Sequence, residues 1–181
     1  FVDNKLIWDN GKFTKNKVKG ASFNAGTKTL TLTNYNGENI FAAGMNLKVV
    51  LNGKNTVKGT IEREYNFTRA VAVIRGSLTV SGTGSLNVSA KNSGTAGSAG
   101  IIGYYGVNIR SGNVSITTKS NDASYGIAVG KGAVKLDLQQ GSSVEIITKV
   151  AQYWRPVAIE AKKISIGSGG TIVQKLGSTK S

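Results

Sequence analysis

Short apolar runs in which every second residue is hydrophobic recur along the chain, separated by turns that contain glycine. One clear set comprises Ile127-Ala-Val129, Leu136-Asp-Leu138 and Val144-Glu-Ile146. Alternation with a period of two places one face of an extended segment in a core and the other in solvent, which is typical of a β-strand. The pattern therefore predicts three strands joined by short turns.

The same three-strand unit recurs before and after this set. The middle strands begin at Leu78, Val107, Leu136 and Ile164, which are 29, 29 and 28 residues apart. The flanking strands recur at similar spacing: first strands Val71–Val73, Ile101–Gly103, Ile127–Val129 and Val157–Ile159; third strands Leu86–Val88, Val114–Ile116, Val144–Ile146 and Thr171–Val173. An earlier, degenerate unit contains Ile40, Leu47–Leu51 and Val57. A long fixed period indicates repeats that bury their apolar faces by stacking on one another.

Three strands per repeat predict an all-β fold: a single right-handed parallel β-helix, or β-solenoid, of about five coils. We expect one domain over residues 1–181, with an N-terminal cap at 1–27, coils at 28–175 and a tail at 176–181. A cap is expected because the first coil would otherwise leave strand edges and core exposed. Trp8, Phe13 and Phe23 are the residues expected to cover that coil.

Composition agrees with a turn-rich β protein, since 39% of residues are hydrophobic and the chain has 24 glycines and one proline. No apolar run approaches the roughly 18 residues of a membrane-spanning helix. Cysteine and histidine are absent, which excludes disulfides, Cys/His zinc sites, cysteine nucleophiles and a Ser-His-Asp triad. The chain starts at Phe1 without an initiator Met or a signal sequence, as expected of a mature-chain boundary.

The chain is strongly basic. It has 23 Lys and Arg against 9 Asp and Glu, a formal net charge of +14. Such a field attracts polyanions at low salt. Solubility alone is the other explanation, although an acidic surface would serve it as well. The charge therefore predicts a polyanionic partner or an anionic surface.

Residues 21–40 resemble a known family. They contain an aromatic at Phe23, then Asn24-Ala-Gly-Thr27, Thr29-Leu-Thr-Leu32, Asn34-x-x-Gly37 and Ile40. This resembles the start of carbohydrate-binding right-handed β-helix domains on surface proteins of Gram-positive bacteria, and the likeness covers roughly residues 20–175. The resemblance implies a pectate-lyase-like architecture without the catalytic apparatus, and polysaccharide recognition on a secreted or cell-surface protein. It leaves structural calcium open; no other cofactor is expected.

The connections from each third strand to the next first strand are longer than the other turns. They span residues 60–69, 90–99, 119–125 and 149–155, and would share one edge of a rod if the coils stack in register. Aromatic rings there can stack on sugars, and cations can pair with carboxylates or phosphates. The predicted ligand-binding residues are Arg63, Tyr65, Arg69, Lys119, Tyr125, Tyr153, Trp154 and Arg155, with Phe67, Lys91 and Lys149 on the same edge. Trp154 has an alternative role, which is to close the core of the last coil.

The outward face of the middle strands is a second candidate surface. With Leu136 and Leu138 inward, Asp137 would lie outward in one row with Thr79, Asn108 and Ser165. This row is either a solvated face with an Asp137–Arg110 pair or a flat surface for a polysaccharide. Tyr104 and Tyr105 either extend a binding face or turn one ring inward.

Catalysis is not expected. Glu62 and Glu64 are the one pair of carboxylates close in sequence, and two carboxylates make a weak calcium or acid–base pattern. Nucleic-acid binding would follow from the charge, but no recognised motif occurs and the cations are spread through the coils. The sequence therefore predicts a non-catalytic module that binds an anionic polysaccharide or cell-wall polymer. The alternative is a structural or adhesive segment of a surface adhesin that binds a host or partner protein.

Overall fold

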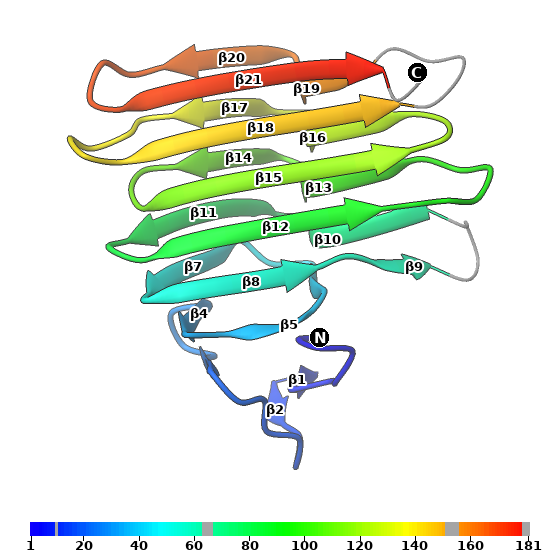
Figure 1. Cartoon of the computed structure of the whole chain (residues 1–181). Coiled ribbons are helices and arrows are strands. Elements are labelled where there is room, and N and C mark those ends of the chain that lie inside the picture. The colour runs from blue at the N-terminus through cyan, green and yellow to red at the C-terminus, as the bar shows by residue number, and fades with distance from the viewer. Residues whose placement is uncertain (10, 63–66, 151–155, 179–181) are drawn as a thin grey trace.

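The computed structural model describes residues 1–9, 11–62, 67–150 and 156–178, and within these ranges the chain forms strands and turns (Figure 1). None of these ranges contains a helix long and apolar enough to cross a membrane.

Apart from a small antiparallel pair near the N-terminus, β1 (Trp8–Asp9) and β2 (Lys12–Phe13), the described strands form three sheets that run along the molecule. The first sheet contains β6 (Ile40–Ala43), β10 (Phe67–Ile74), β13 (Ser98–Gly103), β16 (Ser124–Val129) and β19 (Val157–Glu160), with β9 (Thr60–Glu62) antiparallel to β10. The second contains β3 (Ala21–Asn24), β4 (Thr29–Thr33), β7 (Leu47–Asn52), β11 (Ser77–Gly82), β14 (Gly106–Ile109), β17 (Ala133–Leu136) and β20 (Lys163–Ile166). The third contains β5 (Asn36–Glu38), β8 (Lys54–Lys58), β12 (Ser85–Lys91), β15 (Asn113–Ser120), β18 (Ser143–Val150) and β21 (Thr171–Ser178).

Each coil contributes one strand to each sheet, and the chain returns to the first sheet in the order β6, β10, β13, β16, β19. Followed upward in Figure 1, the chain runs left to right along the third sheet in front and back along the second sheet behind, so the coil is right-handed. This confirms the predicted parallel β-helix, with three strands per coil and five successive sets of strands in the described residues.

The core consists of columns of apolar side chains that run along the axis. Val71, Ile101 and Ile127 are partners in adjacent strands of the first sheet, and each is at most 2% exposed. Equivalent columns line the other two sheets. Burying one such side chain fully contributes about 1.5–3 kcal/mol, and here the surface that buries each residue belongs largely to the neighbouring coils.

The predicted register of the fourth coil was wrong by two residues in the second sheet. Val107 pairs with Val134, and Leu136 pairs with Ile109. The residue beside Asn108 on the outward face is therefore Lys135, and Asp137 lies beyond the end of β17. Residues 134–138 contain three alternating apolar residues, but only two inward positions of β17 pair with β14. The third residue, Leu138, lies after the end of β17 and is still buried. No ion pair joins Asp137 to Arg110, both of which are described.

A glycine in the turn fixes this register. Gly132 lies so close to the carbonyl oxygen of Tyr105 in the preceding coil that an added Cβ would overlap it, and Gly76 is related in the same way to the carbonyl oxygen of Met45. Gly76 comes directly before Ser77, and Gly132 comes directly before Ala133. Ser77 and Ala133 are equivalent residues at the start of their strands, because both pair with Gly106 of the coil between them. Only a residue without a side chain permits this approach, so the glycine decides which residue begins pairing.

Residues near the N-terminus pack against the first coil, among them Val2 and Ile7. The ring of Trp8 lies 5.8 Å from that of Phe23 between centroids, and Phe23 packs against the core, whereas Phe13 is 62% exposed. At the other end, Ile164 and Ile166 are 45% and 61% exposed, although their partners Val134 and Leu136 are fully buried. The last coil thus has no neighbour in the described residues to bury its inward side chains.

Inward side chains of the first and third sheets have complementary sizes where the two sheets meet in the core. The inward-facing Gly100 leaves no room for a Cβ beside Cγ2 of Ile116. One coil earlier, Ala70 takes the equivalent position, between Arg69 and Val71, which pair with Ala99 and Ile101. The partner of Ile116 in that coil is the smaller Val88. Glycine thus accompanies isoleucine, and alanine accompanies valine.

We expect Gly100→Ala to lower the free energy of unfolding by about 1–3 kcal/mol, because it overpacks this site. Urea denaturation followed by circular dichroism measures the change. Gly26→Ala is the control, because its nearest contact, Asn24 Oδ1, lies at an ordinary 3.4 Å; equal loss in the control would contradict the size argument.

Candidate functional site

Three lysines form a column on the outward side of the third sheet. Lys91, Lys119 and Lys149 are Cα partners at the C-terminal ends of the adjacent strands β12, β15 and β18. These ends are the arrowheads on the right of the front sheet in Figure 1. Adjacent parallel strands are about 4.8 Å apart, so one ammonium side chain starts from each strand at that spacing.

The column has no neutralising partner among the described residues. All three lysines are exposed, and no ion pair or hydrogen bond joins any of them to a described side chain. Like charges on directly opposed positions of a sheet are mutually destabilising. The sequence thus places three cations where they repel one another, an arrangement that an anion lying along the axis would relieve.

Apart from Ile147 on β18 and Val173 on β21, the outward side chains on the rest of the same face are polar, and most of the uncharged ones are short. Its outward rows on β12, β15 and β18 contain hydroxyls and amides: Ser85, Asn87, Ser89, Asn113, Ser115, Thr117 and Ser143. Further exposed lysines on this sheet are Lys54, Lys58 and Lys175. The carboxylates on the face are Glu38 and Glu145, and Glu145 Oε1 lies 2.8 Å from Lys175 Nζ. The face is therefore flat, cationic and rich in hydrogen-bonding groups.

A buried hydroxyl network holds the corner beneath the lysine column, where the third sheet passes into the first. Ser124 donates from Oγ to Thr118 Oγ1 at 2.8 Å, and its Oγ lies 3.3 Å from Ser98 Oγ. Ser120 Oγ donates to the carbonyl oxygen of Ala123 at 2.7 Å. All four hydroxyl side chains are fully buried. The network ties the end of β15 to the start of β16 and so fixes the backbone that carries Lys119.

The structure places three of the eight predicted ligand-binding residues. Arg69 and Tyr125 are outward on the first sheet, in one row with Ala99 between them, whereas Lys119 is across the corner on the third sheet. Arg69 Cζ lies 5.6 Å from the centroid of the Phe67 ring. Burial raises the pKa of Tyr125, and the carboxylates of Glu160 and Asp122 raise it further.

The other five predicted residues, Arg63, Tyr65, Tyr153, Trp154 and Arg155, lie outside the described residues. The described ends of the long connections nevertheless share the corner between the third and first sheets, as in-register stacking requires. The polar rows beside the lysine column were not predicted as a site. The alternation of apolar and polar residues within Ser85–Lys91 and Asn113–Ser120 could have predicted these rows, since it places Asn87, Ser115 and the column lysines on one face.

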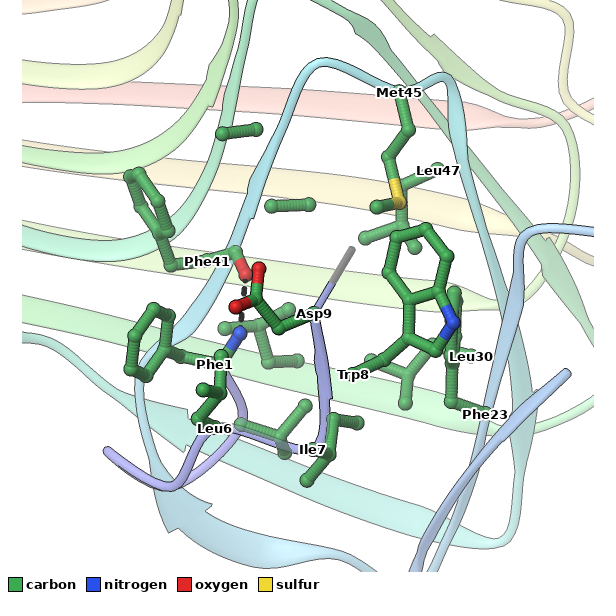
Figure 2. Close-up of a pocket in the computed structure, with 14 residues that line it drawn as sticks. Phe1, Leu6, Ile7, Trp8, Asp9, Phe23, Leu30, Phe41, Met45 and Leu47 are labelled. Atoms are coloured by element: carbon green, nitrogen blue, oxygen red, sulfur yellow. Dashed lines mark hydrogen bonds between the residues drawn. The ribbon is translucent and has the colours of Figure 1, made fainter. Parts of the chain in front are cut away.

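A small cavity lies near the N-terminus, between the cap and the first coil (Figure 2). Its volume is about 150 Å³, and its walls include Trp8, Phe23, Phe41 and Met45. Ligand pockets usually measure about 300–1,000 Å³, and an apolar cavity of this smaller size can stay dry. We therefore attribute the cavity to the packing of the cap on the coil.

The described residues contain no group of three or more Asp or Glu side chains that could hold a metal ion. The chain matches no known protein family, and no curated protein or solved structure matches it either. Function must therefore follow from the geometry and charge of the surfaces of this chain.

We expect Lys119→Gln to raise the free energy of unfolding by a few tenths of a kcal/mol, because it removes the lysine that has a like charge on both sides. The gain should appear near 10 mM salt, where the screening length is about 30 Å, and vanish near 1 M, where it is about 3 Å. Urea denaturation at both salt concentrations measures it. Lys135→Gln is the control, because Lys135 lies between Asn108 and Ser165; an equal gain there would show a net-charge effect.

Proposed function

We propose that this β-helix is a non-catalytic module that binds an anionic polysaccharide along the outward face of its third sheet. The observation that carries the proposal is the column of Lys91, Lys119 and Lys149, which are register partners without counter-charges in the described residues. A linear polyanion lying parallel to the helix axis would meet one cation at each of β12, β15 and β18. Binding would add attraction between the polyanion and the lysines. It would also relieve the repulsion that the three lysines exert on one another in the free protein.

The flat polar rows favour a carbohydrate among the polyanions. Hydroxyl and amide side chains such as Ser89, Asn87 and Ser115 can donate to and accept from sugar hydroxyls. They are short and sit on a rigid sheet, so little side-chain freedom is lost on binding. The resemblance of residues 20–175 to carbohydrate-binding β-helix domains of Gram-positive surface proteins supports the same conclusion, and with it a secreted or cell-surface location.

A second candidate function is that of a structural or adhesive segment that binds a partner protein. The exposed side chains of Ile164, Ile166 and Leu176 on the last coil favour it, because adjacent exposed apolar residues are typical of protein contacts. The two functions use different surfaces, the face of the third sheet and the end of the rod, so variants can separate them.

We expect the triple variant Lys91→Gln, Lys119→Gln, Lys149→Gln to bind polygalacturonate at least about tenfold more weakly than the unmodified protein, since each cation removed costs part of the charge-dependent binding. Calorimetric titration at low and high salt measures the affinity and its salt dependence. A neutral glucan serves as the ligand control. The matched control variant changes Lys48, Lys135 and Lys163 on the second sheet to Gln, which removes the same charge from another face.

Equal weakening in the two triple variants would mean that net charge, rather than the column, governs binding. Failure of the unmodified protein to bind any acidic glycan on an array, together with binding to protein ligands that Ile166→Ser abolishes, would favour the second candidate.

A further inference from the structure

Two adjacent tyrosines project from the corner at which the first sheet turns into the second. Tyr104 and Tyr105 follow β13 and precede β14. Neither ring enters the core, since Tyr105 is 53% exposed and Tyr104 is half-buried. The two rings together present aromatic surface beside a hydrogen-bonded turn.

The surrounding turns hold the two rings in place. The ring centroids are 4.9 Å apart with the planes at 70°, so one ring meets the other edge to face. Tyr104 lies over the next turn, where a Cβ on Gly130 would come within 3.0 Å of its ring, and Lys131 Nζ lies 5.7 Å from its centroid. The backbone of Tyr105 donates to the carbonyl oxygen of Gly76 at 3.0 Å. Tyr104 thus supports Tyr105, whose ring is the more exposed.

Cations flank the tyrosine pair along the axis. Val73, Gly103 and Val129 are partners before the turns, and Ser77, Gly106 and Ala133 are partners after them. The turn that carries Tyr104 and Tyr105 therefore lies between the turns that carry Arg75 and Lys131 and is one residue shorter than either. Arg75 and Lys131 are exposed, and no ion pair joins either of them to a described carboxylate. Arg75 adopts φ = 54°, a left-handed conformation that costs a non-glycine residue energy and recurs at binding sites. The first-sheet carboxylate nearest in register is Glu160, in the last coil.

We propose that Tyr105, Arg75 and Lys131 form a second binding site, which takes a single pyranose ring carrying a carboxylate. The sugar ring would stack on the exposed face of Tyr105, with its apolar C–H bonds against the π-system. The guanidinium of Arg75 would bind the carboxylate in a bidentate manner, and Lys131 would add a second positive charge.

This site is separate from the lysine column. Lys119 precedes β16 and Lys131 follows it, so the two surfaces lie at opposite ends of the first-sheet strands, on different edges of the rod. A polymer lying along the axis on one edge cannot also follow the other. The site therefore recognises one sugar ring or chain end independently of the extended face.

Titration with glucuronate, followed through the aromatic proton resonances in NMR spectra, tests the site, with glucose as the neutral probe of the same ring size. We expect saturable shifts of the Tyr105 ring with glucuronate and at least about tenfold weaker binding of glucose. Tyr105→Ala should weaken glucuronate binding about tenfold, whereas Tyr105→Phe, which keeps the ring, should retain it. Arg75→Gln should weaken glucuronate binding and leave glucose binding unchanged.

Two controls separate this site from other surfaces. Phe13→Ala removes another exposed ring, and the triple Lys91, Lys119, Lys149→Gln variant removes the column; glucuronate binding at Tyr105 should survive both. The proposal is overturned if glucuronate leaves the Tyr105 resonances unshifted, if glucose binds as well as glucuronate, or if Tyr105→Ala binds glucuronate like the unmodified protein. Loss of binding in the triple variant would also overturn it, because the sugar would then sit on the third sheet.

Discussion

Stacking of successive coils in register, at one strand spacing, is the constraint on which the rest of this structure depends. Val71, Ile101 and Ile127 are buried because each lies directly on the next in a parallel sheet. The last coil shows the converse, since Ile164 and Ile166 carry the same pattern as Val134 and Leu136 but remain exposed. Burial in this fold is therefore a property of neighbouring coils rather than of a coil by itself.

The sequence was sufficient for the fold because the repeat is long, regular and made of strand-like alternation. It was insufficient for the register of the fourth coil, where Val134, Leu136 and Leu138 alternate equally well and hydrophobicity cannot choose between them. The information lay instead in Gly132. Aligning it with Gly76 would have given the observed pairing of Val134, because both glycines fit against a carbonyl oxygen of the preceding coil. For β11 and β17, the turn glycine rather than the apolar spacing locates the start of the strand.

The candidate surface was predictable in outline for the same reason. Long connections that follow equivalent strands must share a corner, so Lys91, Lys119 and Lys149 could be assigned to one edge from spacing alone. Their alignment as direct partners could not, since it needs the residue-level register of β12, β15 and β18. The buried network of Ser98, Thr118 and Ser124 was also not foreseen, because a hydroxyl at an inward position breaks the apolar pattern on which the prediction relied.

The geometry that stacks apolar side chains also stacks charges, with the opposite effect on stability. A column of valine and isoleucine lowers the free energy of the folded chain, whereas a column of lysine raises it by a few tenths of a kcal/mol or more per pair. Opposite charges on adjacent strands would remove that cost, as they do elsewhere on the same face, where Lys175 Nζ lies 2.8 Å from Oε1 of its diagonal neighbour Glu145. The described part of the chain provides no such partner for the three column lysines, although the neighbouring outward position on β18 carries Ile147 and could equally carry an acid. The proposed anionic ligand, lying along the axis, would account for both the alignment of the lysines and the lack of acids beside them in the described residues.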